Sequence, residues 1–476
     1  MSQPKPLAGY TSYKNLPPLA GLCSVEDAAK PGLSVEECVR RLKRFHYAFK
    51  RLHHLLTARI TAEPIYELKT TFAHHAHLCA EHATALRTRI GEMREPPLGL
   101  DDVPHPALEA FFDELLCAPE AGWLIAGYRS ALIGLTNVLT EYDADTNPLT
   151  DAPTRRVLRF ASLELEDMLK WATAAIQAIG PSISDERSQW LNYLSELLRS
   201  AGWLDGTMPS SDAVPERRYS KTPYQYDPVP RRDARFTDPW NQGVNAEAFL
   251  YDEAKPARAK ALMMLYKRLR EIDVPEMMAS IITQTPGKPW GYYRDMSRQL
   301  WDEARHAMMG EVGFVALGVD WTQARITFNW SYRLNTECSP MERHGVLYFI
   351  EQGLMPRTGK RYEFEVAQES GLPLMATIQD FDWADEVLHS QIGRQWYVPE
   401  FGSLKEALDY GDRAWSAVLS NWATVKEQGL TEHANWWPTI YSQACAAEGV
   451  APDPDVLAFA TTYEGTRADL QRVAGE

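Results

Sequence analysis

The sequence predicts an all-α protein made of two helical bundles in tandem. Three observations lead to this prediction. Long segments repeat apolar residues at intervals of three and four, as the buried face of a helix requires. Strand-like alternation is weak throughout, and its best example, "ARITFNW", is short. Near the middle of the chain, a segment rich in Pro, Asp, Arg and Tyr at 204–244 interrupts the helical periodicity, so we read it as the connection between two domains.

The first bundle is predicted within residues 1–203. After a Pro-rich leader, a helix is expected at 34–60, with Ser34 as its N-cap and Glu37 completing a capping box. Further helices are expected at 65–94, 106–143 and 153–179, and a fifth at "SDERSQWLNYLSELLRSAG". Segments rich in Pro and Gly separate them, and long helices with short connections are typical of a bundle.

The second bundle is predicted within residues 245–400. Its helices are expected at 245–284, 290–318, 337–355 and 373–397, with a short helix at 361–370. Pro275 should kink the first of these helices or start a new segment there. Residues 401–476 are expected to add two or three helices that pack on this bundle.

Composition and charge exclude several classes of protein. The chain has 476 residues, more than one core usually holds, and a formal net charge of −15. This charge argues against nucleic acid or an anionic membrane as a partner, because binding phosphates needs a basic surface. No segment has the apolar length of a signal peptide core or a membrane span. The six cysteines are scattered without a CxxC pair, as in a reduced, cytoplasmic protein.

Two related motifs carry the chemistry. The segment "WDEARHAMMGE" places Glu303 and His306 three residues apart, and "WADEVLHSQIGRQW" repeats this spacing with Glu386 and His389. Residues three apart on a helix share a face, so each motif presents one carboxylate and one imidazole to the same point. Two such helices that face each other can supply a pair of metal ions. The alternative is that both pairs make surface or capping contacts, which their apolar neighbours Trp, Met, Leu and Ala disfavour.

The two motifs resemble those of the ferritin-like superfamily, which includes rubrerythrins, ribonucleotide reductase small subunits, multicomponent monooxygenases and acyl-carrier desaturases. The resemblance covers residues 245–397, and the "DExRH" form on the second helix is typical of it. It implies a four-helix bundle in which four carboxylates and two histidines bind two ions of iron or manganese. Two further helices must then supply one glutamate each.

On the first helix, Glu276 is the predicted ligand. It lies on a stripe of Leu, Ile and Ala residues and should therefore point inward. Its separation from Glu303, 27 residues, is short for the superfamily. Glu271 is the alternative, but its neighbours Lys267 and Arg268 predict a solvated face.

On the third helix, Glu351 is the predicted ligand. It lies within "LYFIEQGLM", where a carboxylate is costly to bury unless it is paired or bound to a metal, and it precedes Glu386 by 35 residues. Glu342 is the alternative ligand, although with Ser339 it can instead form a capping box. His344 can be an extra ligand, a hydrogen-bond donor to a ligand or, as we favour, a structural histidine.

A ligand set rich in carboxylates, with two imidazoles, suits iron or manganese better than a metal that prefers thiolates. The predicted ligands are Glu276, Glu303, His306, Glu351, Glu386 and His389. The resemblance implies that the glutamates bridge or cap the two ions and that each histidine binds one. Asp302, Asp382 and Asp385 lie next to the motifs, and one of them can accept a hydrogen bond from a histidine and fix its tautomer.

The first bundle has no complete motif of this kind. Seven of the twelve histidines lie between residues 46 and 82, and the pairs His46/His53 and His75/His82 are each seven apart. They can bind a metal between two helices, but packing at a bundle edge explains them equally well. We interpret this bundle as a degenerate copy of the second that supports or covers it.

The resemblance implies an oxidoreductase with two iron ions, or manganese, as cofactor and O2 as co-substrate. The expected reaction is hydroxylation, N-oxygenation, desaturation or oxidative cleavage of a small organic molecule. The alternative is a ferritin-like metal-binding protein without oxygenase turnover, acting as a ferroxidase, in peroxide chemistry or as a scaffold. The sequence leaves open whether the protein forms a homodimer. It also leaves open an external electron donor, because no flavin, nicotinamide or iron–sulfur signature is present.

Overall fold

The structure is a computed structural model that describes residues 7, 9–94, 99–179, 184–420 and 423–463. The protein is 68% helical, with no strand among the described residues, so the predicted all-α class is confirmed. The strand-like segment "ARITFNW" lies partly in a loop and partly at the start of helix α12, Asn329–Glu337. In the described part of the chain, no helix combines the length and the apolar character of a membrane span.

The chain forms two compact units. Unit 1 consists of Met1–Leu52 and Leu78–Tyr224, and unit 2 consists of His53–His77 and Gln225–Glu476. Residues 53–77, which the sequence analysis placed with the first bundle, are therefore part of unit 2. The Pro-rich segment 204–244 contains no helix, and its second part supplies residues to unit 2.

Unit 1 holds most of the N-terminal helices. Helices α2 and α3 are each divided between the two units, while α5 packs against α6 and α4 packs against α7. Ser34 accepts a hydrogen bond from the backbone N–H of Glu37 at the start of α2, as the capping pattern predicts. The helices are α1 Val25–Ala28, α2 Val35–Arg59, α3 Tyr66–Glu92, α4 Pro106–Leu116, α5 Ala121–Asp145, α6 Ala152–Ile179 and α7 Asp185–Ser200.

Unit 2 contains the helices that carry both motifs. They are α8 Ala246–Leu250, α9 Ala257–Arg270, α10 Asp273–Gln284, α11 Trp290–Ala316, α12 Asn329–Glu337, α13 Pro340–Gly353, α14 Tyr362–Glu369, α15 Pro373–Trp396, α16 Leu404–Ser420, α17 Ala423–Glu427, α18 Trp437–Glu448 and α19 Pro454–Leu457. The expected C-terminal helices thus correspond to α16–α19, and residues 464–476 lie outside the described part of the chain.

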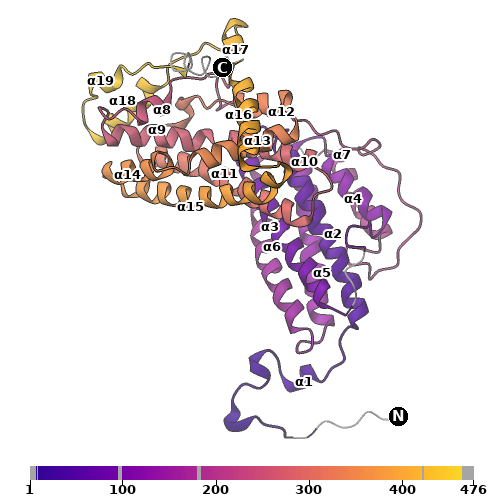
Figure 1. The fold of residues 1–476 in the computed structure, drawn as a ribbon. Helices are drawn as coiled ribbons and strands as arrows, with labels where there is room; N and C mark the ends of the chain where they lie inside the picture. Colours follow the sequence, from indigo (N-terminus) through magenta and orange to yellow (C-terminus); the bar gives the residue numbers. More distant parts are fainter. Residues whose placement is uncertain (1–6, 8, 95–98, 180–183, 421–422, 464–476) are drawn as a thin grey trace. The chain divides into compact units, whose positions relative to one another are not determined.

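Four helical segments of unit 2 contact one another in a closed cycle. The segment α9–α10 packs against α11, α11 packs against α15, α15 against α13, and α13 against α10. In Figure 1, α9, α11 and α15 run alongside one another, with α14 next to α15. Both motifs, on α11 and α15, therefore belong to neighbouring helices of this cycle.

Glycines allow two of these helix pairs to approach closely. A Cβ at Gly310 of α11 would lie 2.4 Å from the backbone nitrogen of Leu269 in α9. A Cβ at Gly393 of α15 would lie 2.2 Å from the ring of Tyr348 in α13. No real Cβ tolerates such distances, so the absence of a side chain at these positions permits the close packing around the motifs.

Local signals set the ends of the helices. The helix predicted at 245–284 is interrupted, because α9 ends at Arg270 and α10 begins at Asp273, with Pro275 in the first turn of α10. This break confirms the prediction made for Pro275. Helix α13 starts with the predicted capping box, in which Ser339 and Glu342 satisfy each other's backbone N–H groups.

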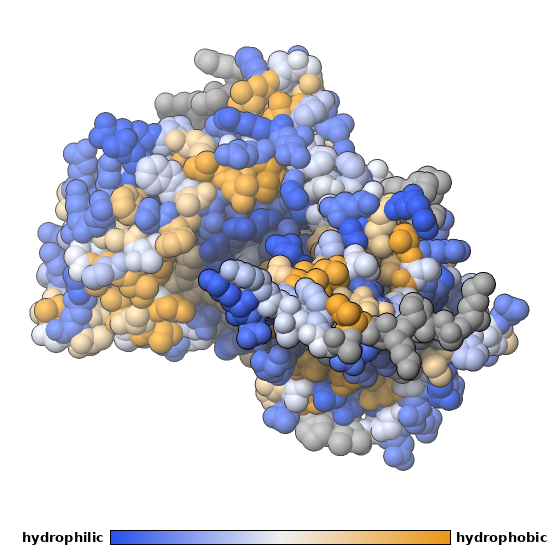
Figure 2. Space-filling view, turned by 90° about the horizontal axis from the view of Figure 1, so that it is seen from below, coloured by the Kyte–Doolittle hydropathy of each residue, from blue (hydrophilic) through white to orange (hydrophobic). Residues whose placement is uncertain are grey.

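The surface of the molecule mixes hydrophilic residues with separate hydrophobic groups (Figure 2). One shallow apolar groove runs between α11 and α15, where Met309 and Val312 meet Leu374, Ile378 and Phe381.

Candidate metal centre

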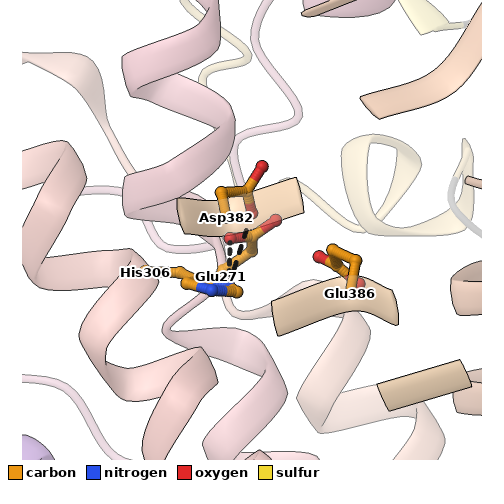
Figure 3. A group of neighbouring side chains, drawn as sticks. All are labelled: Glu271, His306, Asp382 and Glu386. Carbon is orange, nitrogen blue, oxygen red and sulfur yellow. Dashed lines mark ion pairs between the residues drawn. The ribbon is translucent and has the colours of Figure 1, made fainter. Parts of the chain in front are cut away.

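Two groups of side chains in unit 2 can each hold a metal ion, since their possible ligand atoms lie within 4.8 Å of one another. We call them the Glu271 site and the Glu351 site. Figure 3 shows the first, in which Glu271, His306 and Asp382 lie close together with Glu386 beside them. The Glu271 site consists of Glu271, His306, Asp382 and Glu386, and the Glu351 site consists of Glu303, Glu351, Glu386 and His389.

Two glutamates link the sites. Glu386 belongs to both groups. Glu303 reaches both histidines, with one carboxylate oxygen 3.2 Å from His389 Nδ1 and the other 3.6 Å from His306 Nδ1. A carboxylate whose two oxygens face two different imidazoles has the arrangement needed to bridge two metal ions.

Four of the possible ligand atoms make no hydrogen bond to the described residues although they are buried. This holds for Nδ1 of His306 and of His389, and for one carboxylate oxygen each of Glu271 and Glu386. Buried polar atoms without a partner are rare, because desolvation of such an atom costs free energy that nothing restores. Their convergence is an independent indication that a cation belongs among them.

The other nitrogen of each histidine contacts an aspartate of the opposite motif. His306 Nε2 lies 3.1 Å from Asp385, and His389 Nε2 lies 3.4 Å from Asp302. An Nε2–H group that donates to a carboxylate leaves the Nδ1 lone pair for a metal, so both aspartates fix the useful tautomer. The sequence analysis expected at least one such contact.

The histidines carry protons when no metal ion is present. Burial acts to lower the pKa of His306, but its contacts with Asp385, Glu271 and Glu303 outweigh burial and raise the pKa to about 10. Burial opposes the charge of His389 in the same way, yet its contacts with Asp302 and neighbouring glutamates raise its pKa well above the usual range. A metal ion must therefore displace a proton from each imidazole.

The pKa values of Glu351 and Glu386 shift in opposite directions because their neighbours differ in charge. Burial and the negative charge of Glu386 raise the pKa of Glu351 well above its usual range. Burial also acts to raise the pKa of Glu386, but the ammonium group of Lys360 and the neighbouring Glu351 and His389 lower it well below that range. The raised pKa of Glu351 favours its protonated form, which limits the negative charge of the Glu351 site. A divalent cation can take the place of this proton.

Asp385 provides a test of the contact that orients His306. Replacing Asp385 with Ala removes the acceptor of the Nε2–H group, and we expect divalent metal to bind about 10- to 100-fold more weakly. Titration with Mn2+, followed calorimetrically, measures the change. Asp380→Ala is the matched control, because Asp380 is an exposed aspartate of the same helix. Unchanged affinity in Asp385→Ala would show that the contact does not position a ligand.

A cavity of about 190 Å3 reaches the centre. Its wall includes Glu271, Glu303, Glu351 and Glu386, three basic residues of α9, and apolar side chains from α10, α12 and α13. The apolar residues include Met277, Leu334, Leu347, Ile350 and Leu354. A small, mainly apolar molecule can therefore lie next to the possible ligands.

The structure brings together five of the six predicted ligands but not Glu276. Its carboxylate is fully buried 2.9 Å from Lys69 Nζ and 2.8 Å from Arg232 Nε, and Ser331 donates to it at 2.8 Å. The apolar stripe correctly indicated an inward position, but the break between α9 and α10 directs Glu276 to another polar network.

Glu271, the alternative, lies in the centre instead. The neighbours Lys267 and Arg268 predicted a solvated face for Glu271, but both are buried and paired with acidic residues. The spacing along the sequence favours Glu271, which precedes Glu303 by 32 residues. This is closer than the 27 residues of Glu276 to the 35 that separate Glu351 from Glu386.

Sequence patterns indicated two residues of the centre only weakly or not at all. Asp382 was expected only as a neighbour of the ligands, and it belongs to the Glu271 site. No sequence pattern indicated Lys360, which lies in the short π-helix Arg357–Arg361 outside the long helices. Its ammonium group contacts both Asp382 and Glu386, a pairing that depends on how this π-helix packs against α15.

The remaining candidates lie outside the two sites. Glu342 forms the capping box of α13. His344 is buried against the rings of Tyr292 and Tyr397, and burial lowers its pKa to about 3, so it stays neutral. Among the described residues, the N-terminal histidines form no comparable metal-binding group.

Comparison with protein-family models, with curated proteins and with solved structures gave no match. The argument for a function therefore depends on the residues and geometry of this chain.

Proposed function

We propose that the protein is a non-haem dinuclear metal oxidoreductase, an O2-activating oxidase or oxygenase that acts on a small organic molecule. Unit 2 would be a four-helix bundle of the ferritin-like kind, with α9–α10, α11, α13 and α15 as its helices. Glu271, Glu303, Glu351 and Glu386 would provide one carboxylate from each helix, and His306 and His389 would complete the set.

One observation carries the proposal: possible ligand atoms converge from four helical segments on two adjacent points, and four of these buried atoms make no hydrogen bond within the described part of the chain. Glu386 is common to both points, and Glu303 faces both histidines. Oxygen and imidazole nitrogen donors favour iron or manganese. When bound and reduced, such a pair of ions supplies the electrons and open positions needed to activate O2.

The protein's own residues have defined tasks in this reaction. The buried carboxylates hold the charge of the ions in a site from which bulk water is largely excluded. Asp302 and Asp385 keep each Nε2–H group in place, so that Nδ1 remains the ligand atom. The apolar wall of the cavity holds an organic molecule beside the ions.

The cavity favours an oxygenase over a ferroxidase. Beside its charged residues, the cavity has an apolar side formed by α10, α12 and α13, which can hold an organic molecule next to the carboxylates. Insertion of one oxygen atom of O2 into a substrate reduces the other atom to water, which requires two electrons and two protons. We propose an external electron donor for this step.

Metal content tests the proposal. Protein loaded with Fe2+ under anaerobic conditions and then desalted should contain two ions per chain, measured by mass spectrometry. Glu303→Gln with Glu386→Gln should lose both, because it removes the two linking carboxylates at nearly constant volume. Glu342→Gln, whose glutamate only caps α13, should keep both. A single zinc ion per chain, or an unchanged content in the double variant, would refute the dinuclear centre.

Oxygen consumption separates the two classes of activity. After anaerobic loading, an oxygenase should consume O2 repeatedly only with an organic substrate and a reductant. A ferroxidase should instead consume O2 with every fresh addition of Fe2+ and no organic molecule, which would favour the metal-handling alternative.

A further inference from the structure

The Glu271 site contains positive charge of its own. The Nζ atom of Lys360 lies 2.8 Å from Glu386 and 2.9 Å from both carboxylate oxygens of Asp382. Arg268, in the last turn of α9, pairs with Asp382 and with Glu271, the latter at 2.8 Å. The side chains of Lys360 and Arg268 are 0% and 1% exposed, so water cannot screen these pairs.

In the Glu351 site, only the shared Glu386 contacts a lysine or arginine of the described part of the chain. Among the ion pairs of the described residues, Glu303 and Glu351 pair only with histidines. Glu351 also accepts a hydrogen bond of 3.0 Å from the amide of Gln299, which is neutral. The two sites therefore differ in charge although they share Glu386.

The two carboxylate oxygens of Glu386 have different neighbours. Its Oε1 atom contacts Lys360, whereas its Oε2 atom makes no hydrogen bond and lies 3.5 Å from His389 Nδ1. One oxygen is thus available to the Glu351 site, while the ammonium group occupies the other. A divalent cation in the Glu271 site would either lie close to a buried ammonium group or displace it.

We propose that Lys360 sets the order in which the centre fills. The Glu351 site takes a divalent cation first, and the Glu271 site takes the second only when the Lys360 ammonium group leaves Glu386 and Asp382. Arg268 stays with Glu271 and Asp382 and keeps the second ion weakly held. This inference depends on the proposed metal centre and concerns the occupancy of its two halves.

Calorimetric titration of the full chain with Mn2+ tests the order. Wild type should bind one ion tightly and a second about 10- to 100-fold more weakly, the range by which groups in contact with ligands usually change metal affinity. Lys360→Met, which keeps the side-chain length but removes the charge, should tighten the second step and leave the first unchanged. Lys260→Met is the matched control, because Lys260 is a buried lysine whose Nζ contacts the hydroxyl of Tyr362 instead of an acid of the centre.

Each result has a distinct meaning. Two equal steps in wild type, with no change in Lys360→Met, would overturn the order of filling and leave the dinuclear centre intact. No Mn2+ bound by any of the folded proteins would overturn the centre itself. One ion in wild type and two in Lys360→Met would support the inference in its strongest form.

Two further variants keep the test independent of the folding of Lys360→Met. Glu351→Gln should abolish the tight step, because Glu351 belongs only to the site that fills first. Asp382→Asn should leave the tight step unchanged and alter only the weak one. The opposite pattern would contradict the proposed order. Circular dichroism of each variant establishes that it is folded.

Discussion

Glu276→Gln is expected to lower the free energy of unfolding by about 3–5 kcal/mol without removing a metal ion. Glu276 is the common partner of Lys69 and Arg232, and all three side chains are almost completely buried. Burial acts to raise the pKa of Glu276, but Arg232 and then Lys69 lower it, so the carboxylate is charged. Its loss leaves Lys69 as a buried cation without the carboxylate at 2.9 Å, while Arg232 retains Asp273 at 2.7 Å.

Urea denaturation of the metal-free protein, followed by tryptophan fluorescence, measures this change, and metal analysis completes it. Glu276→Met combined with Lys69→Met should recover much of the stability, because apolar groups can replace a buried ion pair at little cost. Glu271→Gln should show the opposite behaviour, with weaker binding of one ion and a smaller change in stability. If Glu276→Gln were instead stable and lost an ion, Glu276 would be a ligand.

Metal affinity is expected to rise steeply with pH. In the metal-free protein the raised pKa of His306, about 10, means that its imidazole carries a proton throughout the neutral range. Binding at Nδ1 releases this proton, so affinity should increase about tenfold per pH unit for each proton released, until the pH approaches that pKa. His389, whose pKa is also raised, should contribute in the same direction for its ion.

Calorimetry with Mn2+ between pH 6 and 8, in two buffers of different ionisation enthalpy, counts the released protons. We expect at least one per ion, and His306→Gln should lose one of them together with the second ion. His344→Gln should release as many protons as wild type, because His344 is already neutral. Equal affinity across this pH range would exclude protonated histidines as ligands.

The raised pKa of His306 also predicts that the metal-free protein becomes less stable as the pH rises. The pKa of His306 is higher in the folded protein than its ordinary value of 6.5. The stability that this proton provides is therefore complete below pH 6.5 and is lost as the pH rises toward 10. Raising the pH should thus weaken the metal-free protein while it strengthens metal binding.

The sequence by itself determined the helical class and the composition of both motifs. Helical periodicity and capping residues depend on neighbours three or four positions away, so they can be read locally, as at Ser339 and Glu342. The same local rule placed Glu303 with His306 and Glu386 with His389, because residues three apart share a helix face whatever the rest of the chain does. Spacing along the chain also indicated Glu351.

Only the tertiary structure decided which other charged groups join them. Glu271 is partly buried and Glu276 is fully buried, and the break between α9 and α10 determines that one faces the centre while the other faces Lys69. Lys360 comes from the short π-helix Arg357–Arg361, which the apolar periodicity of an α-helix does not predict. The free energy of a buried charge depends on partners distant in sequence, so local patterns identify a side chain able to bind a metal but not the cations that compete for it.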